Sequence, residues 1–194
     1  MKLEVKICGL TRRCDVELAA ALGADYLGFV IYEGSRRYVT AEKLAELTHG
    51  LPPHVRKVGV FVDASRDEIL RAVEAGALDI VQLHGREDAD FARSIGFAEV
   101  WKATYDPGFP AARLVCDAPQ GGSGRFGDHE KAAELAKARP VMLAGGLAPD
   151  NVVELVRYVR PAGIDLAGGV EAAPGVKDEE KLRKLFQNLK GIEL

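Results

Sequence analysis

The stretch Val5-Lys6-Ile7-Cys8-Gly9-Leu10-Thr11, near the start of the sequence, carries the first signal of the fold. An apolar run leads to a cysteine, a glycine then lets the chain turn, and Thr11 can cap a following helix. In a barrel of parallel strands, chemistry is presented at such strand ends. Cys8 is therefore a candidate catalytic residue. The alternative is that Cys8 is a small buried hydrophobic residue, as most free cysteines are.

The same order of strand, turn and helix repeats along the chain. Eight short apolar runs are expected to be strands, at residues 3–8, 26–31, 57–62, 79–83, 100–103, 113–116, 141–144 and 164–167. Their nearly continuous apolar character is typical of strands that are buried on both faces. A helix is expected after each strand except the fifth, because residues 104–110 contain two prolines and leave no room for a full helix.

Alternating strands and helices occur both in open doubly wound sheets and in closed barrels. The count of eight strands favours a (β/α)8 TIM barrel with a parallel eight-stranded sheet. Glycine pairs after the seventh and eighth strands, Gly145-Gly146 and Gly168-Gly169, favour the same fold. No linker or low-complexity segment interrupts the pattern, so we expect one barrel domain over residues 1–194.

The composition excludes several classes of protein. The 194 residues are 47% hydrophobic and 28% charged, with a formal net charge of −3. The sequence has no basic stripe of the kind that would indicate a nucleic-acid partner. It also has no apolar run that approaches the roughly 18 residues needed to cross a membrane. The start of the sequence is too polar for a secretory signal. Three cysteines without disulfide or zinc spacing indicate a reducing cytoplasm and predict no metal site.

Polar residues and glycines gather at the expected carboxyl ends of the strands, where a barrel has its active site. Closure of the barrel would bring them around one mouth although they are far apart in sequence. Strand alternation places Lys6 with Cys8 on one face, and Gln82 with His84 on one face, so both pairs can point inward. The candidate site residues are Cys8, Arg37, His84, Asp117, Gly145, Gly146, Gly168 and Gly169.

The two glycine pairs predict a phosphate site, because loops after strands seven and eight of a barrel bind phosphate through backbone N–H groups. The alternative is that these glycines only make tight turns. The segment Gly121-Gly122-Ser123-Gly124 lacks the Lys-Ser/Thr pair of a nucleotide P-loop. We interpret it as a mobile loop over the site.

The position of a charged candidate residue in the sequence does not decide its role. Asp117 can be a proton donor, a helix cap or a salt-bridge partner. His84 can be a catalyst or a structural hydrogen-bonding residue. Arg37 can grip a carboxylate with its two-pronged guanidinium, or it can be a solvated surface residue. Cys14 and Cys116 are expected to serve packing.

Seven segments, in order and over nearly the whole chain, resemble the phosphoribosylanthranilate isomerase family of tryptophan biosynthesis. They are Lys6-Ile7-Cys8-Gly9-Leu10-Thr11, Ser35-Arg36-Arg37-Tyr38-Val39, Val58-Gly59-Val60-Phe61-Val62, Val81-Gln82-Leu83-His84-Gly85, Gly121-Gly122-Ser123-Gly124, Leu143-Ala144-Gly145-Gly146-Leu147, and Gly169-Val170-Glu171 with Gly175-Val176-Lys177-Asp178. Together these segments are highly specific, although no single one would be.

The resemblance implies a cofactor-free and metal-free barrel that acts on a phosphorylated small molecule. We expect a monomer or a homodimer. It implies an Amadori rearrangement of N-(5-phosphoribosyl)anthranilate to 1-(2-carboxyphenylamino)-1-deoxyribulose 5-phosphate. It makes Cys8 the general base and Asp117 the general acid. It places Arg37 near the anthranilate carboxylate.

The chain departs from the family pattern in three places. Ala167-Gly168 stands where the family commonly has two serines, so a serine hydroxyl contact is lost. The segment Arg125-Phe126-Gly127-Asp128-His129 is one residue short, and the loop between Asp117 and Gly121 is brief. These departures affect the geometry of the loop and leave the two catalytic positions in place.

Three other hypotheses about the function remain. A sugar-phosphate epimerase of the metal type would need histidines and carboxylates at several strand ends, and only His84 and Asp117 qualify. An aldolase would need a desolvated strand lysine, for which Lys102 is the candidate. The third reading is a barrel that binds a phosphorylated ligand without turnover.

Overall fold

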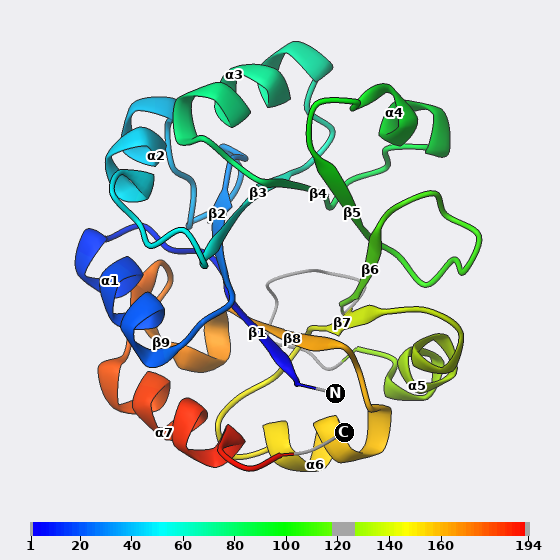
Figure 1. Cartoon of the computed structure of the whole chain (residues 1–194). Helices are drawn as coiled ribbons and strands as arrows, with labels where there is room; N and C mark the ends of the chain where they lie inside the picture. Colours follow the sequence, from blue (N-terminus) through cyan, green and yellow to red (C-terminus); the bar gives the residue numbers. More distant parts are fainter. Residues whose placement is uncertain (1, 118–126, 193–194) are drawn as a thin grey trace.

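The computed structural model describes residues 2–117 and 127–192, and its strands form one closed barrel (Figure 1). The strands are β1 (Glu4–Ile7), β2 (Tyr26–Val30), β3 (Arg56–Phe61), β4 (Ile80–Leu83), β5 (Glu99–Ala103), β6 (Arg113–Cys116), β7 (Val141–Leu143) and β8 (Gly163–Leu166). They run parallel in sequence order, and β8 pairs with β1 to close the ring. The predicted (β/α)8 barrel is confirmed.

Helices form the outer layer of the barrel, as Figure 1 shows. They are α1 (Arg13–Leu22), α2 (Ala41–Thr48), α3 (Arg66–Gly76), α4 (Ala89–Ser94), α5 (His129–Ala138), α6 (Val152–Val159) and α7 (Glu179–Leu189). Residues 104–112 connect β5 to β6 without a helix, as the two prolines predicted. The predicted loop at Gly121–Gly124 lies outside the described residues.

Local capping sets the ends of several helices. Gly23 ends α1 in the left-handed conformation at φ 102°, where glycine has no steric cost. Thr40 accepts a hydrogen bond from the Lys43 N–H at the start of α2. Ser65 and Glu68 form a capping box that starts α3.

The expectation that Thr11 caps the first helix is wrong. Helix α1 begins two residues later, at Arg13, and the Thr11 hydroxyl donates to the carbonyl of Gly175 at 2.6 Å. The partner belongs to a short hairpin after β8, made of β9 (Glu171–Ala173) and β10 (Val176–Lys177). The strand and helix pattern did not predict this hairpin, which takes the Thr11 hydroxyl away from the helix.

Apolar side chains pack in two layers, one inside the barrel and one between the strands and the helices. The inner layer contains Tyr26, Val58, Ile80, Trp101, Val115, Met142 and Ala144. Removing such surface from water stabilises the fold by roughly 25 cal/mol per Å². The interior of the barrel is therefore a packed core and leaves room for a ligand only at an end.

The amino end of the barrel is closed by polar contacts. The Tyr26 hydroxyl donates to Glu4 at 2.9 Å, and Arg113 pairs with the same carboxylate. The Arg113 guanidinium also lies 5.0 Å from the centre of the Trp101 ring. A ligand must consequently approach from the opposite end.

Within the part of the chain that the structure describes, no helix is long and apolar enough to span a bilayer.

Candidate active site

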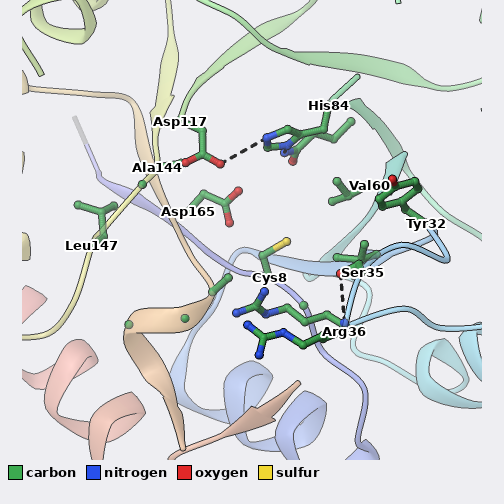
Figure 2. A pocket seen from close by; sticks show the side chains of 18 of the residues that line it. Cys8, Tyr32, Ser35, Arg36, Val60, His84, Asp117, Ala144, Leu147 and Asp165 are labelled. Atoms are coloured by element: carbon green, nitrogen blue, oxygen red, sulfur yellow. Dashed lines mark hydrogen bonds and ion pairs between the residues drawn. The ribbon is translucent and has the colours of Figure 1, made fainter. Parts of the chain in front are cut away.

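A cavity of about 690 Å³ opens at the carboxyl ends of the strands. All the predicted site residues line it: Cys8, Arg37, His84, Asp117, Gly145, Gly146, Gly168 and Gly169. Figure 2 shows the side chains from different strands turned toward one space. Closure of the barrel therefore gathers the residues that the sequence scatters.

Cys8 follows the last residue of β1 and is buried with its thiol in the cavity wall. A Cβ on Gly28 would lie 2.7 Å from the Cys8 sulfur, so glycine on the neighbouring strand leaves room for the thiol. Burial raises the pKa of Cys8, while the ammonium groups of Lys6 and Lys177 act in the opposite direction. The two cations are the groups that favour a thiolate here.

Lys6 and Asp165 form a buried ion pair on the cavity floor. Their strands pair with these two residues in register, and Lys6 Nζ lies 2.6 Å from Asp165 Oδ2. Burial disfavours the charged lysine, but Asp165 and Cys8 together outweigh this effect and raise the pKa of Lys6. A fixed positive charge therefore lies beneath Cys8.

Asp117 follows β6, and its carboxylate lies 3.4 Å from His84 Nε2 across the cavity from Cys8 (Figure 2). Gln82 approaches the other ring nitrogen of His84 at 3.4 Å. The Tyr105 hydroxyl donates to the Asp117 carbonyl and accepts from the Asp128 N–H, both at 3.0 Å. Backbone and side chain of Asp117 are thus held from two directions.

Arg37 is not a solvated surface arginine, because its side chain is only 12% exposed. Its Nε and Nη2 donate to the two oxygens of Glu171 at 2.9 and 2.7 Å. Lys177 Nζ also donates to Glu171 at 2.9 Å, and to the Cys8 carbonyl at 2.6 Å. A Cβ on Gly9 would lie 2.4 Å from Cδ of Arg37, so glycine there makes room for the aliphatic part of the Arg37 side chain.

The two glycine pairs bring the loops after β7 and β8 together. Gly145 and Gly146 adopt φ values of 80° and 68°, which other residues rarely tolerate. A Cβ on Gly169 would lie 1.9 Å from the Leu147 carbonyl oxygen, so these loops touch through their backbones. Gly168 begins a 3-10 turn, Gly168–Val170. The departure Ala167-Gly168 thus leaves backbone N–H groups at the cavity edge.

The aldolase candidate Lys102 points elsewhere. Its ammonium is buried against Glu87 at 2.7 Å and against the Gly85 carbonyl at 2.7 Å, and it does not line the cavity. Cys116 is fully buried in β6, where burial raises its pKa to about 12. Cys14 is exposed on α1, so packing does not account for it. Among residues 2–117 and 127–192, no group of three His, Cys, Asp or Glu could hold a metal.

Three buried charged residues at or beside the cavity were not predicted as site residues: Asp165, Glu171 and Lys177. Glu171 and Lys177 stood in a quoted segment, but their partners lie far away, Arg37 being 134 residues from Glu171. Asp165 is a single charge inside an apolar run, between Ile164 and Leu166. A buried charge must be paired or used, and this interruption was the signal that could have identified Asp165.

A closed eight-stranded barrel with a polar cavity at the carboxyl ends of its strands defines a (β/α)8-barrel enzyme. Residues 5–188 match the family of N-(5'phosphoribosyl)anthranilate (PRA) isomerases. The N-(5'-phosphoribosyl)anthranilate isomerase of Streptococcus pneumoniae is 41% identical over 192 residues, which cover 96% of each chain. The chain therefore belongs to the phosphoribosylanthranilate isomerase family, the isomerases of tryptophan biosynthesis.

Solved structures agree with this assignment. The phosphoribosyl anthranilate isomerase from Thermus thermophilus superposes with a TM-score of 0.91 at 45% identity, covering 96% of this chain and 98% of that one. A second isomerase of the family, in complex with reduced 1-(o-carboxyphenylamino)-1-deoxyribulose 5-phosphate, gives a TM-score of 0.89 at 33% identity, with coverage of 98% and 100%. The expected family, fold and enzyme class are confirmed.

Proposed function

We propose that the chain catalyses the Amadori rearrangement of N-(5'-phosphoribosyl)anthranilate, with Asp117 as general acid and Cys8 as general base. The observation that carries the proposal is the position of these two side chains, after β6 and β1, on opposite sides of one cavity (Figure 2). The sugar lies between them. The reaction needs no organic cofactor or metal, because each step moves a proton.

The steps follow from the chemistry of the substrate. Asp117 gives a proton to the ring oxygen, the bond from that oxygen to C1 breaks, and the nitrogen lone pair forms an iminium with C1. The Cys8 thiolate then takes the proton from C2, and the C2–H electrons form an enolamine. Protonation at C1 and loss of the C2 hydroxyl proton give the ketone. Acid and base groups of this kind typically contribute about 10²–10⁴-fold each.

The remaining groups hold the two charged ends of the substrate. The backbones of Gly145-Gly146 and Gly168-Gly169 bind the phosphate through N–H groups. Arg37 binds the anthranilate carboxylate with Nη1, which has no hydrogen-bond partner among the described residues, while Glu171 fixes the other edge of its guanidinium. His84, beside Asp117, completes the substrate-binding wall.

We also propose that the enzyme works in the cytoplasm, as a monomer or a homodimer. A relative from Thermotoga maritima is a dimeric isomerase from which monomers have been generated. Sedimentation of the purified chain distinguishes the two states.

The function is tested by following the loss of phosphoribosylanthranilate fluorescence after the purified chain is added. We expect turnover without added metal or cofactor, and unchanged turnover after treatment with a chelator. Substrate that persists at its spontaneous decay rate would contradict the proposed activity.

A further inference from the structure

The buried carboxylates of the chain differ in how well their oxygens are satisfied. Among the described residues they are Asp15, Glu87, Asp165 and Glu171. Both oxygens of Glu87 are bonded, one to the Asp63 N–H and the other to Gly85 N–H and Lys102. Asp15 and Glu171 likewise use both oxygens. Asp165 bonds Lys6 through Oδ2 alone, and its Oδ1 has no partner in the described part of the chain.

An unsatisfied buried acceptor costs free energy in the unliganded protein, because water no longer solvates it. The Asp165 side chain is only 8% exposed, yet it lines the cavity. Its other oxygen is fixed by Lys6 at 2.6 Å, so the carboxylate is rigid. A rigid, unpaired acceptor in a cavity is suited to a ligand that brings a hydrogen-bond donor.

The position of Asp165 selects which donor that is. Figure 2 shows Asp165 between Asp117 and Cys8. The carboxylate and phosphate of the substrate have no proton to donate to an anion at neutral pH. The amine N–H of the substrate is already bonded to the ortho carboxylate of its own anthranilate ring, so a sugar hydroxyl is the donor that remains for Asp165. In the proposed reaction C2 faces Cys8. The hydroxyl on C2 is therefore the group that comes closest to Asp165.

We propose that Asp165 is a substrate-binding residue whose Oδ1 accepts a hydrogen bond from the C2 hydroxyl of the sugar. This inference rests on the proposed function. It makes Asp165 a specificity determinant that separates ribose-derived substrates from their 2-deoxy counterparts. A site built around a buried polar group rejects a ligand without the matching group, because its own group then stays unpaired.

Two stable probes test the proposal without turnover. Reductive amination of ribose 5-phosphate with anthranilate gives the reduced product analogue, which carries the C2 hydroxyl. The same reaction with 2-deoxyribose 5-phosphate gives an analogue that lacks only this hydroxyl. Dissociation constants are measured by calorimetry for the wild type, Asp165→Asn and Glu87→Gln. Glu87→Gln is the matched control, since it alters a buried lysine–carboxylate pair outside the cavity.

We expect the wild type to prefer the hydroxylated probe by about tenfold or more, as for a hydrogen bond to a charged group. Asp165→Asn should reduce the preference to less than about threefold, and Glu87→Gln should keep it. If Asp165→Asn does not fold, Lys6→Met with Asp165→Leu removes the pair together and should also lose the preference.

Equal affinity of the wild type for the two probes would overturn the proposal, as would a preference that survives in Asp165→Asn. Failure of the underlying function looks different, because the wild type would then bind neither probe and would not consume phosphoribosylanthranilate.

Discussion

At the scale of single residues, the site depends on charges that are held out of water beside a thiol. Cys8 is buried, and burial raises its pKa, whereas Lys6 and Lys177 favour the thiolate. Burial lowers the pKa of Lys177 itself, although Glu171 opposes this effect. The thiolate form that the proposed general base requires is therefore increasingly favoured as the pH rises.

The pH dependence of alkylation measures this property. In a Cys14→Ser variant, which removes the exposed cysteine, iodoacetamide should modify Cys8 with a midpoint above the ordinary thiol range. Cys116 should stay unmodified because it is fully buried. The value of kcat/KM should rise over the same pH range. Mass spectrometry gives the extent of modification, and a midpoint below the ordinary range would contradict the account.

Arg37→Ala should raise KM more than it lowers kcat, because a carboxylate contact is present in both ground state and transition state. The thermal unfolding midpoint should also fall, since Glu171 loses two hydrogen bonds. Arg37→Lys should not restore KM, because a lysine cannot hold Glu171 with a fork and also reach the substrate. A selective loss of kcat with normal KM would count against this role.

At the scale of elements, the loops after β7 and β8 are positioned by Gly145, Gly146 and Gly169, where a side chain would be strained or would clash. The contact between Gly169 and the Leu147 carbonyl sets the separation of the two loops, and hence the spacing of the backbone N–H groups that we propose as phosphate donors. The proposed binding by backbone groups should tolerate Ala167-Gly168 in place of serines, because the N–H groups do not depend on the side chain.

Gly169→Ala should push these loops apart, because the added methyl group would meet the Leu147 oxygen at 1.9 Å. We expect the affinity for inorganic phosphate, measured as competitive inhibition, to fall by about tenfold or more. Gly96→Ala is the matched control, since nothing lies within 4 Å of its added Cβ. Unchanged inhibition in Gly169→Ala would show that the phosphate binds elsewhere.

At the scale of the whole molecule, closure of the barrel joins contacts that the chain separates widely. Lys177 Nζ bonds the Cys8 carbonyl after β1 and the Ala167 carbonyl after β8, at 2.6 and 3.2 Å. Glu171 anchors the same ammonium. This cluster of Lys177, Glu171 and the two carbonyls joins the ends of the first and last strands, and we call it the seam. It links the stability of the barrel to the geometry of the site.

Acid should weaken this seam. Burial alone would raise the pKa of Glu171, but Arg37 and Lys177 hold it below the usual value. The unfolded chain therefore takes up the proton first, and stability present above the unfolded pKa, about 4.3, is lost as the pH falls through the folded pKa. Glu171→Gln should be less stable at pH 7 by about 2 kcal/mol or more, and its stability should depend less on acid.

Urea unfolding at pH 7 and at pH 3, below the unfolded pKa of about 4.3, gives the two free energies. Glu17→Gln is the control, because its carboxylate is 60% exposed in a surface pair with Arg13 and should change stability by less than about 1 kcal/mol. If Glu171→Gln and the wild type lose the same free energy of unfolding in acid, the cluster around Glu171 is not the source of the acid sensitivity.

The order of strands, the absent helix after β5 and the positions of Cys8 and Asp117 could be predicted because they depend on local patterns. Apolar runs, prolines and glycines each act within a few residues. The link between Arg37 and Glu171, the hairpin that holds Thr11 and the Lys6–Asp165 pair could not, because each joins distant segments only after the barrel closes. The mobile loop expected at Gly121–Gly124 lies outside the described part of the chain, so it stays a prediction.

The proposed roles of Cys8 as general base and Asp117 as general acid are tested most directly by the kinetics of Cys8→Ala and Asp117→Asn. We measure kcat by loss of phosphoribosylanthranilate fluorescence, and affinity by binding of the reduced product analogue. Each variant should lose about 10²–10⁴-fold in kcat, while affinity changes only a few-fold, because acid and base act in the transition state. Near-normal kcat in both variants would contradict the account and make His84 the next residue to test.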